Sequence, residues 1–175
     1  MGFIRYIFLI LVVTGSTSIG FLLSKSYGDR VKELKTLSNL INVLQNKIKF
    51  THKPLSSIFE EISQIPQNQK EHGISKIFFK SAKKIETQKL EDAWNDAISE
   101  ERFFLNLKNE DIELIKSLGT LLGKTDIEGQ MSEIEQFKTM LETQIKIAEE
   151  EKNKNSKMYK SLGTIIGLAI VIVLF

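Results

Sequence analysis

The sequence predicts an all-α membrane protein, in which a compact cytosolic bundle of about six helices is flanked by an N-terminal and a C-terminal transmembrane helix. Three observations predict this fold: an apolar segment at each end, apolar residues every three or four positions between them, and no stretch that alternates like a strand. The predicted domains are the N-terminal transmembrane helix at 1–24, the cytosolic helical domain at 25–157 and the C-terminal transmembrane helix at 158–175.

The first apolar segment spans residues 3–23 and carries Arg5 as its only charge. About 20 helical residues at 1.5 Å each cross a hydrocarbon core of about 30 Å, so this segment is long enough. A cleaved signal peptide is the alternative interpretation. The run is longer than a typical signal-peptide core, however, and no A-x-A-like cleavage site follows it. We therefore expect an uncleaved membrane helix.

The second apolar segment, residues 162–175, is shorter and covers only about 22 Å as a helix from Ser161. Lys157 and Lys160 can extend toward the headgroups and Tyr159 can lie at their level, which lengthens the effective span. A buried or interfacial C-terminal helix is the alternative. Because the segment has no polar face, we expect a second membrane helix.

The flanking basic residues predict the orientation. Only Arg5 and the amino terminus lie at the outer end of the first apolar segment, and no basic residue follows the second. The inner flanks carry Lys25, Arg30, Lys32 and Lys35, and Lys152, Lys154, Lys157 and Lys160. Basic residues next to membrane helices favour the cytosolic side. We therefore expect both termini outside and residues 25–157 in the cytosol.

Helical periodicity continues between the two apolar segments. Apolar stripes with three-four spacing lie at residues 31–48, 55–62, 74–82, 90–98, 112–122 and 131–148. Pro54 opens the second helix and Pro66 closes it. Trp94 lies on one face with Leu90 and Ile98, so we expect it in the core.

Two further helix starts are predicted from capping patterns. The fifth helix begins through Asn109, with Glu110 and Asp111 in its first turn, where carboxylates suit the helix dipole. The sixth begins at Thr125, which has capping-box spacing to Glu128.

Catalytic chemistry has no support in the sequence, and no catalytic, cofactor or metal residues are expected. There are no cysteines, no phosphate loop, no GxSxG and no HExxH. His52 and His72 lie at loop-like positions, and Glu60, Glu61 and the acids at 149–151 fit solvated helix faces. A net charge of +2 without a clustered basic face argues against nucleic-acid binding.

Two pairs of glycines lie one turn apart. Gly119 and Gly123 occupy SLGTLLG at 117–123, where glycine permits close helix approach or, at Gly123, a helix end. Gly163 and Gly167 occupy SLGTIIG at 161–167, within the second apolar segment. Small residues at this spacing let membrane helices pack closely. The small pair of the first apolar segment is a candidate mate, at Ser16 and Gly20.

Four parts of the chain together resemble one family. They are LGTLLGKTDIEGQ at 118–130, the step Lys53-Pro54-Leu55, the pair Ala93-Trp94, and the closing KMYKSLGTIIGLAIVIVLF. The most specific is LGxxLGxxDxxxQ, here Leu118, Gly119, Leu122, Gly123, Asp126 and Gln130. Over essentially its whole length the chain resembles the stage III sporulation protein AB family. Lys124-Thr125 departs from the pattern, in which a smaller first residue is expected.

The resemblance implies a non-enzymatic platform. Such proteins are similar to the cytoplasmic domain of the F platform proteins of type II secretion and type IV pili. The implied setting is the complex linking mother cell and forespore, in the mother-cell-derived outer forespore membrane. The implied partners are a cytosolic secretion-type ATPase, the AA protein of the same operon, and other membrane proteins of that complex; self-association is left open.

Two other function classes compete with the platform. A generic helical membrane adaptor or signalling coiled coil would oligomerise without an ATPase partner. The two prolines and the short helices favour a compact domain over such a coiled coil. A membrane enzyme or kinase dimerisation domain would need a reactive histidine on an amphipathic helix, which neither His52 nor His72 provides.

Overall fold

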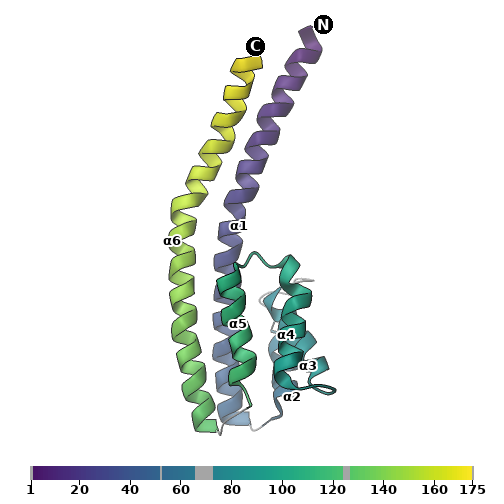
Figure 1. Cartoon of the computed structure of the whole chain (residues 1–175), viewed down its shortest axis with the longest axis vertical. Coiled ribbons are helices and arrows are strands. Elements are labelled where there is room, and N and C mark those ends of the chain that lie inside the picture. The colour runs from purple at the N-terminus through teal and green to yellow at the C-terminus, as the bar shows by residue number, and fades with distance from the viewer. Residues whose placement is uncertain (1, 52, 66–72, 124–126, 175) are drawn as a thin grey trace. The chain divides into compact units, whose positions relative to one another are not determined.

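The computed structural model describes residues 2–51, 53–65, 73–123 and 127–174. Within these ranges the chain is helical and contains no strand, so the all-α fold class is confirmed. The elements, shown in Figure 1, are α1 (Gly2–Thr51), α2 (Leu55–Ser63), α3 (Ile74–Lys84), α4 (Leu90–Glu101), the 3₁₀ turn η2 (Arg102–Phe104), α5 (Asn109–Leu121) and α6 (Ile127–Leu174).

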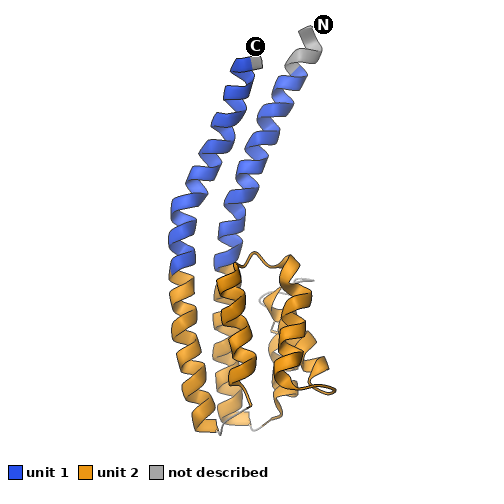
Figure 2. Cartoon of the chain, viewed as in Figure 1, with its two compact units in different colours: residues 1–31, 147–175 blue, residues 32–146 orange. Residues whose placement is uncertain are grey.

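The helices form two compact units, which Figure 2 distinguishes by colour. Unit 1 contains residues 1–31 and 147–175, and unit 2 contains residues 32–146. The two long helices α1 and α6 each contribute one part to unit 1 and the other part to unit 2.

Unit 2 is built around the predicted apolar stripes. Leu34, Leu37 and Ile41 of α1 are fully buried, as are Phe137 and Leu141 of α6. The short helices α2, α3, α4 and α5 pack in sequence order, α2 on α3, α3 on α4 and α4 on α5. This pattern follows from the period of the stripes, because residues three and four apart lie on one helix face.

The helix ends agree with the expected chemistry in part. Pro54 directly precedes α2, and its carbonyl accepts the Ile58 N–H at 3.1 Å. The expected start of α5 is confirmed, because the helix begins at Asn109 and has Glu110 and Asp111 in its first turn. The N-cap is Lys108, because its backbone N–H donates to the Asp111 carboxylate at 2.9 Å and thereby closes the first turn.

Several residues named from the sequence lie outside the described ranges. They are His52, Pro66, His72, Lys124, Thr125 and Asp126. The proposed closure of α2 by Pro66 and the capping box of Thr125 therefore remain predictions.

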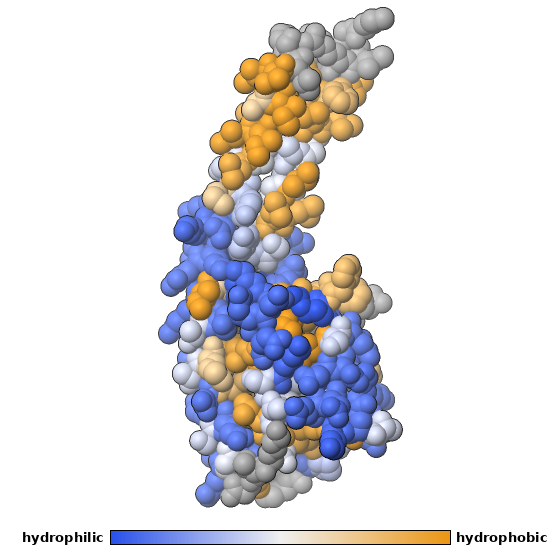
Figure 3. All heavy atoms as spheres, in the orientation of Figure 1, coloured by the Kyte–Doolittle hydropathy of each residue, from blue (hydrophilic) through white to orange (hydrophobic). Residues whose placement is uncertain are grey.

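The surface of unit 1 is strongly apolar. Large apolar side chains are exposed along both of its helices, including Phe8, Leu11, Leu22, Ile165, Leu168 and Ile172. Figure 3 shows this apolar surface in orange along the described part of the two terminal segments. By length and composition, α1 and α6 can each cross a membrane. Such exposure is costly in water and natural in lipid, so unit 1 fits membrane association.

Candidate functional site

The strongest candidate site is the contact between α1 and α6 in unit 1, where two glycines meet. A Cβ atom on Gly20 would lie 2.6 Å from the Tyr159 carbonyl oxygen and 3.0 Å from the Gly163 Cα. A Cβ atom on Gly163 would lie 2.8 Å from the Ser16 carbonyl oxygen and 3.0 Å from the Gly20 Cα. The two backbones therefore touch directly, and no larger residue fits at either position unless the helices move apart.

The other two small residues lie in the same contact. A Cβ atom on Gly167 would overlap the Ser16 hydroxyl and would lie 3.2 Å from the Val13 Cα. The Ser16 hydroxyl donates to the Val13 carbonyl of its own helix at 3.1 Å. The structure thus brings together all four residues of the predicted membrane packing set, Ser16, Gly20, Gly163 and Gly167.

Not every glycine of α1 is part of this contact. A Cβ atom on Gly15 would have no other heavy atom within 4 Å, and the same is true of Gly28. The close approach therefore depends on one face of α1, and Gly15 provides an internal comparison for it.

Polar pairs continue the contact between α1 and α6 beyond the glycines. The hydroxyls of Ser24 and Ser156 lie 2.5 Å apart. The Tyr27 and Tyr159 rings stack with centroids 5.8 Å apart. Stacked tyrosines suit the headgroup level of a membrane, where one end of the ring is apolar and the other is hydrated.

An ion pair lies further along the same two helices. Arg30 donates to Glu151 at 2.5 Å, and the Arg30 side chain is only 4% exposed. A guanidinium this deeply covered needs a carboxylate partner, because burial of an unpaired charge is very unfavourable. From the sequence, Arg30 is one of the flanking basic residues and Glu151 one of the acids of a solvated helix face. Their pairing depends on the alignment of α1 with α6.

A second candidate is the family motif in unit 2, in which Gly119 packs directly against Trp94. The indole is fully buried, and its N–H donates to the Ile115 carbonyl at 2.7 Å. The rings of Phe59 and Phe78 lie 5.5 Å and 5.0 Å from it. A Cβ atom on Gly119 would lie 2.7 Å from the Trp94 Cδ1 atom, so glycine provides the space that the indole fills.

The remaining motif residues also have structural positions. Leu118 and Leu122 are buried, and Gly123 has φ of 80°, a left-handed conformation that glycine adopts without strain after a helix. Gln130 lies half-buried on α6. Asp126 lies outside the described ranges. The described part of the motif therefore places the end of α5 against α4.

An ionic cluster joins α3 to α4. Lys80 lies 2.9 Å from Glu100 and 2.8 Å from Glu101, and Lys84 lies 2.7 Å from Glu100. Hydrogen bonds from Lys84 and then Lys80 lower the pKa of Glu100, and hydrogen bonds to Glu101 and Glu100 raise the pKa of Lys80. Each shift favours the charged form, as expected of groups that stabilise a helix contact.

Buried Glu101 is a feature that sequence analysis missed. Its side chain is 1% exposed and accepts the Gly73 N–H at 3.0 Å, one residue before α3 begins. No local pattern identifies this role, because Gly73 lies 28 residues earlier. Asp111 was also missed as a buried group, although its position in the first turn of α5 is typical of a capping residue.

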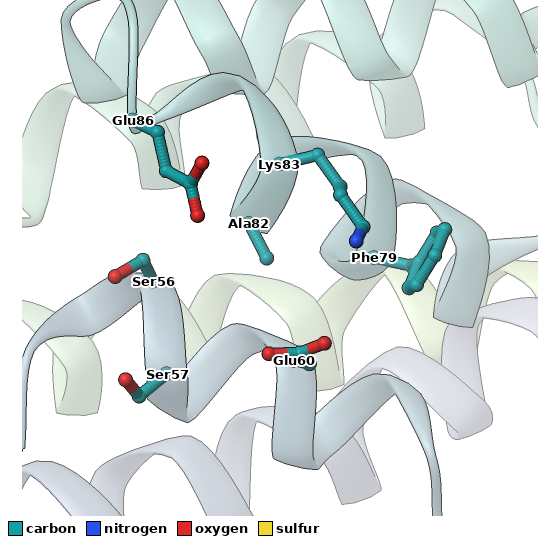
Figure 4. Close-up of a pocket in the computed structure, with 7 residues that line it drawn as sticks. All are labelled: Ser56, Ser57, Glu60, Phe79, Ala82, Lys83 and Glu86. Atoms are coloured by element: carbon teal, nitrogen blue, oxygen red, sulfur yellow. The ribbon is translucent and has the colours of Figure 1, made fainter.

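Two cavities lined by described residues lack the features of a catalytic site. One, of about 80 Å³, lies between α2 and α3 and is lined by Ser56, Ser57, Glu60, Phe79, Ala82, Lys83 and Glu86 (Figure 4). It is much smaller than a typical ligand pocket of about 300 Å³ or more. The other, of about 320 Å³, is lined by Thr36, Asn39, Leu40, Asn42, Val43, Ile65 and Ser75, none of which ionises near neutral pH. Among the described residues, no three His, Cys, Asp or Glu side chains form a metal-binding group.

Fold and site together define a class: an all-helical protein with two candidate membrane helices in close backbone contact. The sequence profile of the family described as "Stage III sporulation protein AB" matches residues 5–175. The chain therefore belongs to the stage III sporulation protein AB family.

Two similar proteins carry the same description. The chain is 28% identical to the stage III sporulation protein AB of Bacillus subtilis (strain 168) over 167 residues, which cover 94% of this chain and 95% of that protein. A solved structure of a stage III sporulation protein AB is similar in fold, with a TM-score of 0.64 and 23% identity. That likeness covers 72% of this chain and 98% of the solved one. These names state a sporulation role and no catalytic activity.

Proposed function

We propose that the chain is a non-enzymatic platform in the membrane complex that connects mother cell and forespore during endospore formation. The observation that carries the proposal is the family match over residues 5–175. In this role the chain couples a cytosolic secretion-type ATPase to membrane components of a channel or pilus-like apparatus. The membrane is the mother-cell-derived outer forespore membrane.

The construction of the chain supports a mechanical role. A platform needs a stable attachment to the membrane and a rigid body that a motor can engage. Unit 1 offers two apolar helices in direct backbone contact at Gly20 and Gly163. Unit 2 offers a helical body with fully buried aromatic residues such as Trp94 and Phe78. Neither feature supplies a group that reacts with a substrate.

The basic flanks support a cytosolic location for residues 25–157, where a cytosolic ATPase can reach them. In the described structure Lys25, Lys32 and Lys154 are exposed beside the apolar segments. Exposed lysines near membrane helices remain on the cytosolic side during insertion.

Co-purification tests the proposed partner. The full chain, reconstituted in lipid nanodiscs, is mixed with the purified ATPase encoded in the same operon, with and without nucleotide. We expect the ATPase to co-elute with loaded nanodiscs and not with empty ones or with discs carrying an unrelated two-helix protein. Equal retention on all three kinds of disc would reject the coupling role and would favour an adaptor without an ATPase.

A further inference from the structure

Phe103, in the η2 turn of unit 2, is exposed to an unusual degree. Its side chain is 91% exposed, the largest value for any large apolar residue in the described part of the chain. The Phe104 ring stands edge-on to it, with centroids 5.7 Å apart and planes at 89°. A phenyl ring in this position adds no burial to the unit, so its contribution to folding is small.

The turn that carries Phe103 is firmly braced. Arg102 donates to the Leu107 carbonyl and to the Asn109 side chain, both at 3.0 Å. Leu105 and Leu107 are buried, with 6% and 5% exposed. The Asn106 N–H donates to the Glu33 carboxylate of α1 at 3.0 Å. The ring is therefore held outward by a turn that is already ordered, so little conformational entropy is lost when the ring meets a partner.

The hydrogen bond from Asn106 to Glu33 links the segment after η2 to the part of α1 that follows the apolar segment. Tyr27 stacks on Tyr159, and this pair suits the headgroup level. Six residues separate Tyr27 from Glu33, a distance of about 9 Å as a helix and at most about 20 Å for extended chain. Within unit 2, the α4–α5 connection lies at the opposite end from the junction of α1 and α2 (Figure 2). The upper limit of about 20 Å between Tyr27 and Glu33 follows from the number of residues alone.

The exposed area and the nearby charges favour a lipid surface as the partner of Phe103. A single aromatic side chain buries about 150–250 Å², whereas a stable protein interface buries about 800 Å² on each partner. The two exposed rings of Phe103 and Phe104 are by themselves far below the area of a protein interface, whereas single aromatic side chains partition into the interfacial layer of a membrane. Lys32, Lys35 and Lys108 are exposed beside the Glu33–Asn106 contact, and such lysines attract anionic headgroups.

We propose that Phe103 inserts into the interfacial layer of the same membrane that α1 and α6 associate with, with Phe104 supporting the ring. Unit 2 thereby gains a lipid contact in addition to its two connecting helices. The proposal rests on the membrane association of unit 1 and on unit 2 lying on the basic, inner side. It does not depend on the ATPase, so failure of either idea leaves the other testable.

Tryptophan substitution tests this contact in the full chain. Phe103→Trp keeps a large aromatic side chain, and the native Trp94 is fully buried, so its fluorescence is a constant background. The variant is reconstituted in vesicles of phosphatidylcholine and phosphatidylglycerol, with or without lipids brominated near the headgroup. The matched control is Phe50→Trp, since Phe50 is 69% exposed on α1 near its junction with α2.

The expected result is loss of most of the added fluorescence at position 103 on brominated vesicles, with a blue-shifted emission, and no loss at position 50. Iodide in the aqueous phase should give the opposite ranking. If iodide rather than brominated lipid quenches the indole at 103, the ring lies in water and the proposal is overturned. If neither quencher acts, protein covers the ring, and the lipid contact is equally rejected.

Discussion

Trp94 and Gly119 illustrate, at the scale of single residues, what a sequence can and cannot predict. The position of Trp94 in an apolar stripe predicted burial, and the glycine inside a helix predicted a close approach. The stripe did not predict that these two residues would meet, because their separation depends on how α4 packs on α5. The hydrogen bond from the indole to the Ile115 carbonyl, at 2.7 Å, likewise requires the folded helix pair.

Replacement of Trp94 by alanine is expected to destabilise unit 2 by about 3–5 kcal/mol, as is typical for a large aromatic lost from a core. The change also removes the hydrogen-bond donor of the Ile115 carbonyl. Chemical unfolding of the full chain in mild detergent, followed by circular dichroism, measures the effect. Phe103→Ala is the matched control, because that ring is 91% exposed. An unchanged unfolding midpoint for Trp94→Ala would contradict the core role.

Alanine substitutions at two glycines should change the stability of the protein in opposite directions. Gly119→Ala places a Cβ atom 2.7 Å from the indole and should cost about 1–3 kcal/mol through overpacking. Gly28→Ala places one in open space within α1 and should be neutral or stabilising, by up to about 1 kcal/mol. The midpoints of thermal unfolding of the two variants decide the matter. Stabilisation by Gly119→Ala would show that α4 and α5 can move apart freely.

At the scale of helices, the spacing of apolar residues predicted which helix faces are buried. Ile58 and Phe59 of α2 and Ile77 and Phe78 of α3 were predicted from spacing, and all four are buried. The η2 turn was not predicted, and the segment after it contacts a residue far away in the sequence, since Asn106 donates to Glu33, 73 residues earlier. Ionic contacts between helices were missed for the same reason.

The paired glycines of unit 1 predict a defect in function without a defect in insertion. Gly163→Leu combined with Gly167→Leu increases the apolar content of α6, so the variant should fractionate with membranes as well as the native chain. The same change fills the space beside Gly20 and Ser16, so the helices must separate. We expect arrested spore development after engulfment, measured as a spore count beside membrane fractionation.

Gly15→Leu is the control for that experiment, since its Cβ atom would have no other heavy atom within 4 Å. It should both insert and sporulate normally. Normal sporulation of the double leucine variant would mean that the contact between α1 and α6 has no role and that the second segment is only an anchor.

The contacts of Glu61 with Lys47 and Lys53 predict how the packing of α2 against α1 depends on pH. Lys47 of α1 donates to Glu61, as does Lys53, and these bonds lower its pKa from 4.5 to about 2. A lowered pKa in the folded state adds stability that is complete above about pH 4.5 and is lost as pH falls toward 2. Unfolding temperatures of the native chain and Glu61→Gln should therefore converge between these values.

The adjacent exposed residue gives the control for this pH series. Glu60→Gln removes the same charge from α2 but leaves both lysine contacts of Glu61 in place. Its difference from the native chain should change little over the same range. If the unfolding temperatures of the native chain and Glu61→Gln differed by the same amount down to low pH, the lysine contacts would add no stability.

At the scale of the whole molecule, hydropathy predicted two terminal segments and a helical body, but not where packing changes. The apolar run ends near residue 23, whereas unit 1 extends to Val31. The difference arises because Ser24, Tyr27 and Arg30 continue the pairing of α1 with α6 through polar contacts. Hydropathy does not detect pairing of this kind.

Orientation in the membrane can be tested with introduced thiols, because the chain has no cysteines. Ser26→Cys, Ser99→Cys and Ser156→Cys are each expected to resist an impermeant thiol reagent in intact cells, and exposed Ser99→Cys should react after permeabilisation. Ser99 is the most informative position because it is exposed in the middle of unit 2. Its labelling from outside intact cells would reverse the predicted topology.

The glycine contact between α1 and α6 also changes the unfolded state of the rest of the chain. While the two helices stay paired in lipid, residues 32–146 remain a closed loop even when unit 2 has lost its packing. A covalent cross-link around a loop of about 100 residues removes entropy worth about 4–5 kcal/mol, and a persistent helix pair imposes the same constraint for as long as it lasts. The paired helices in the membrane therefore reduce the conformational entropy of unfolded unit 2, as a disulfide does in a secreted domain, although the chain contains no cysteine.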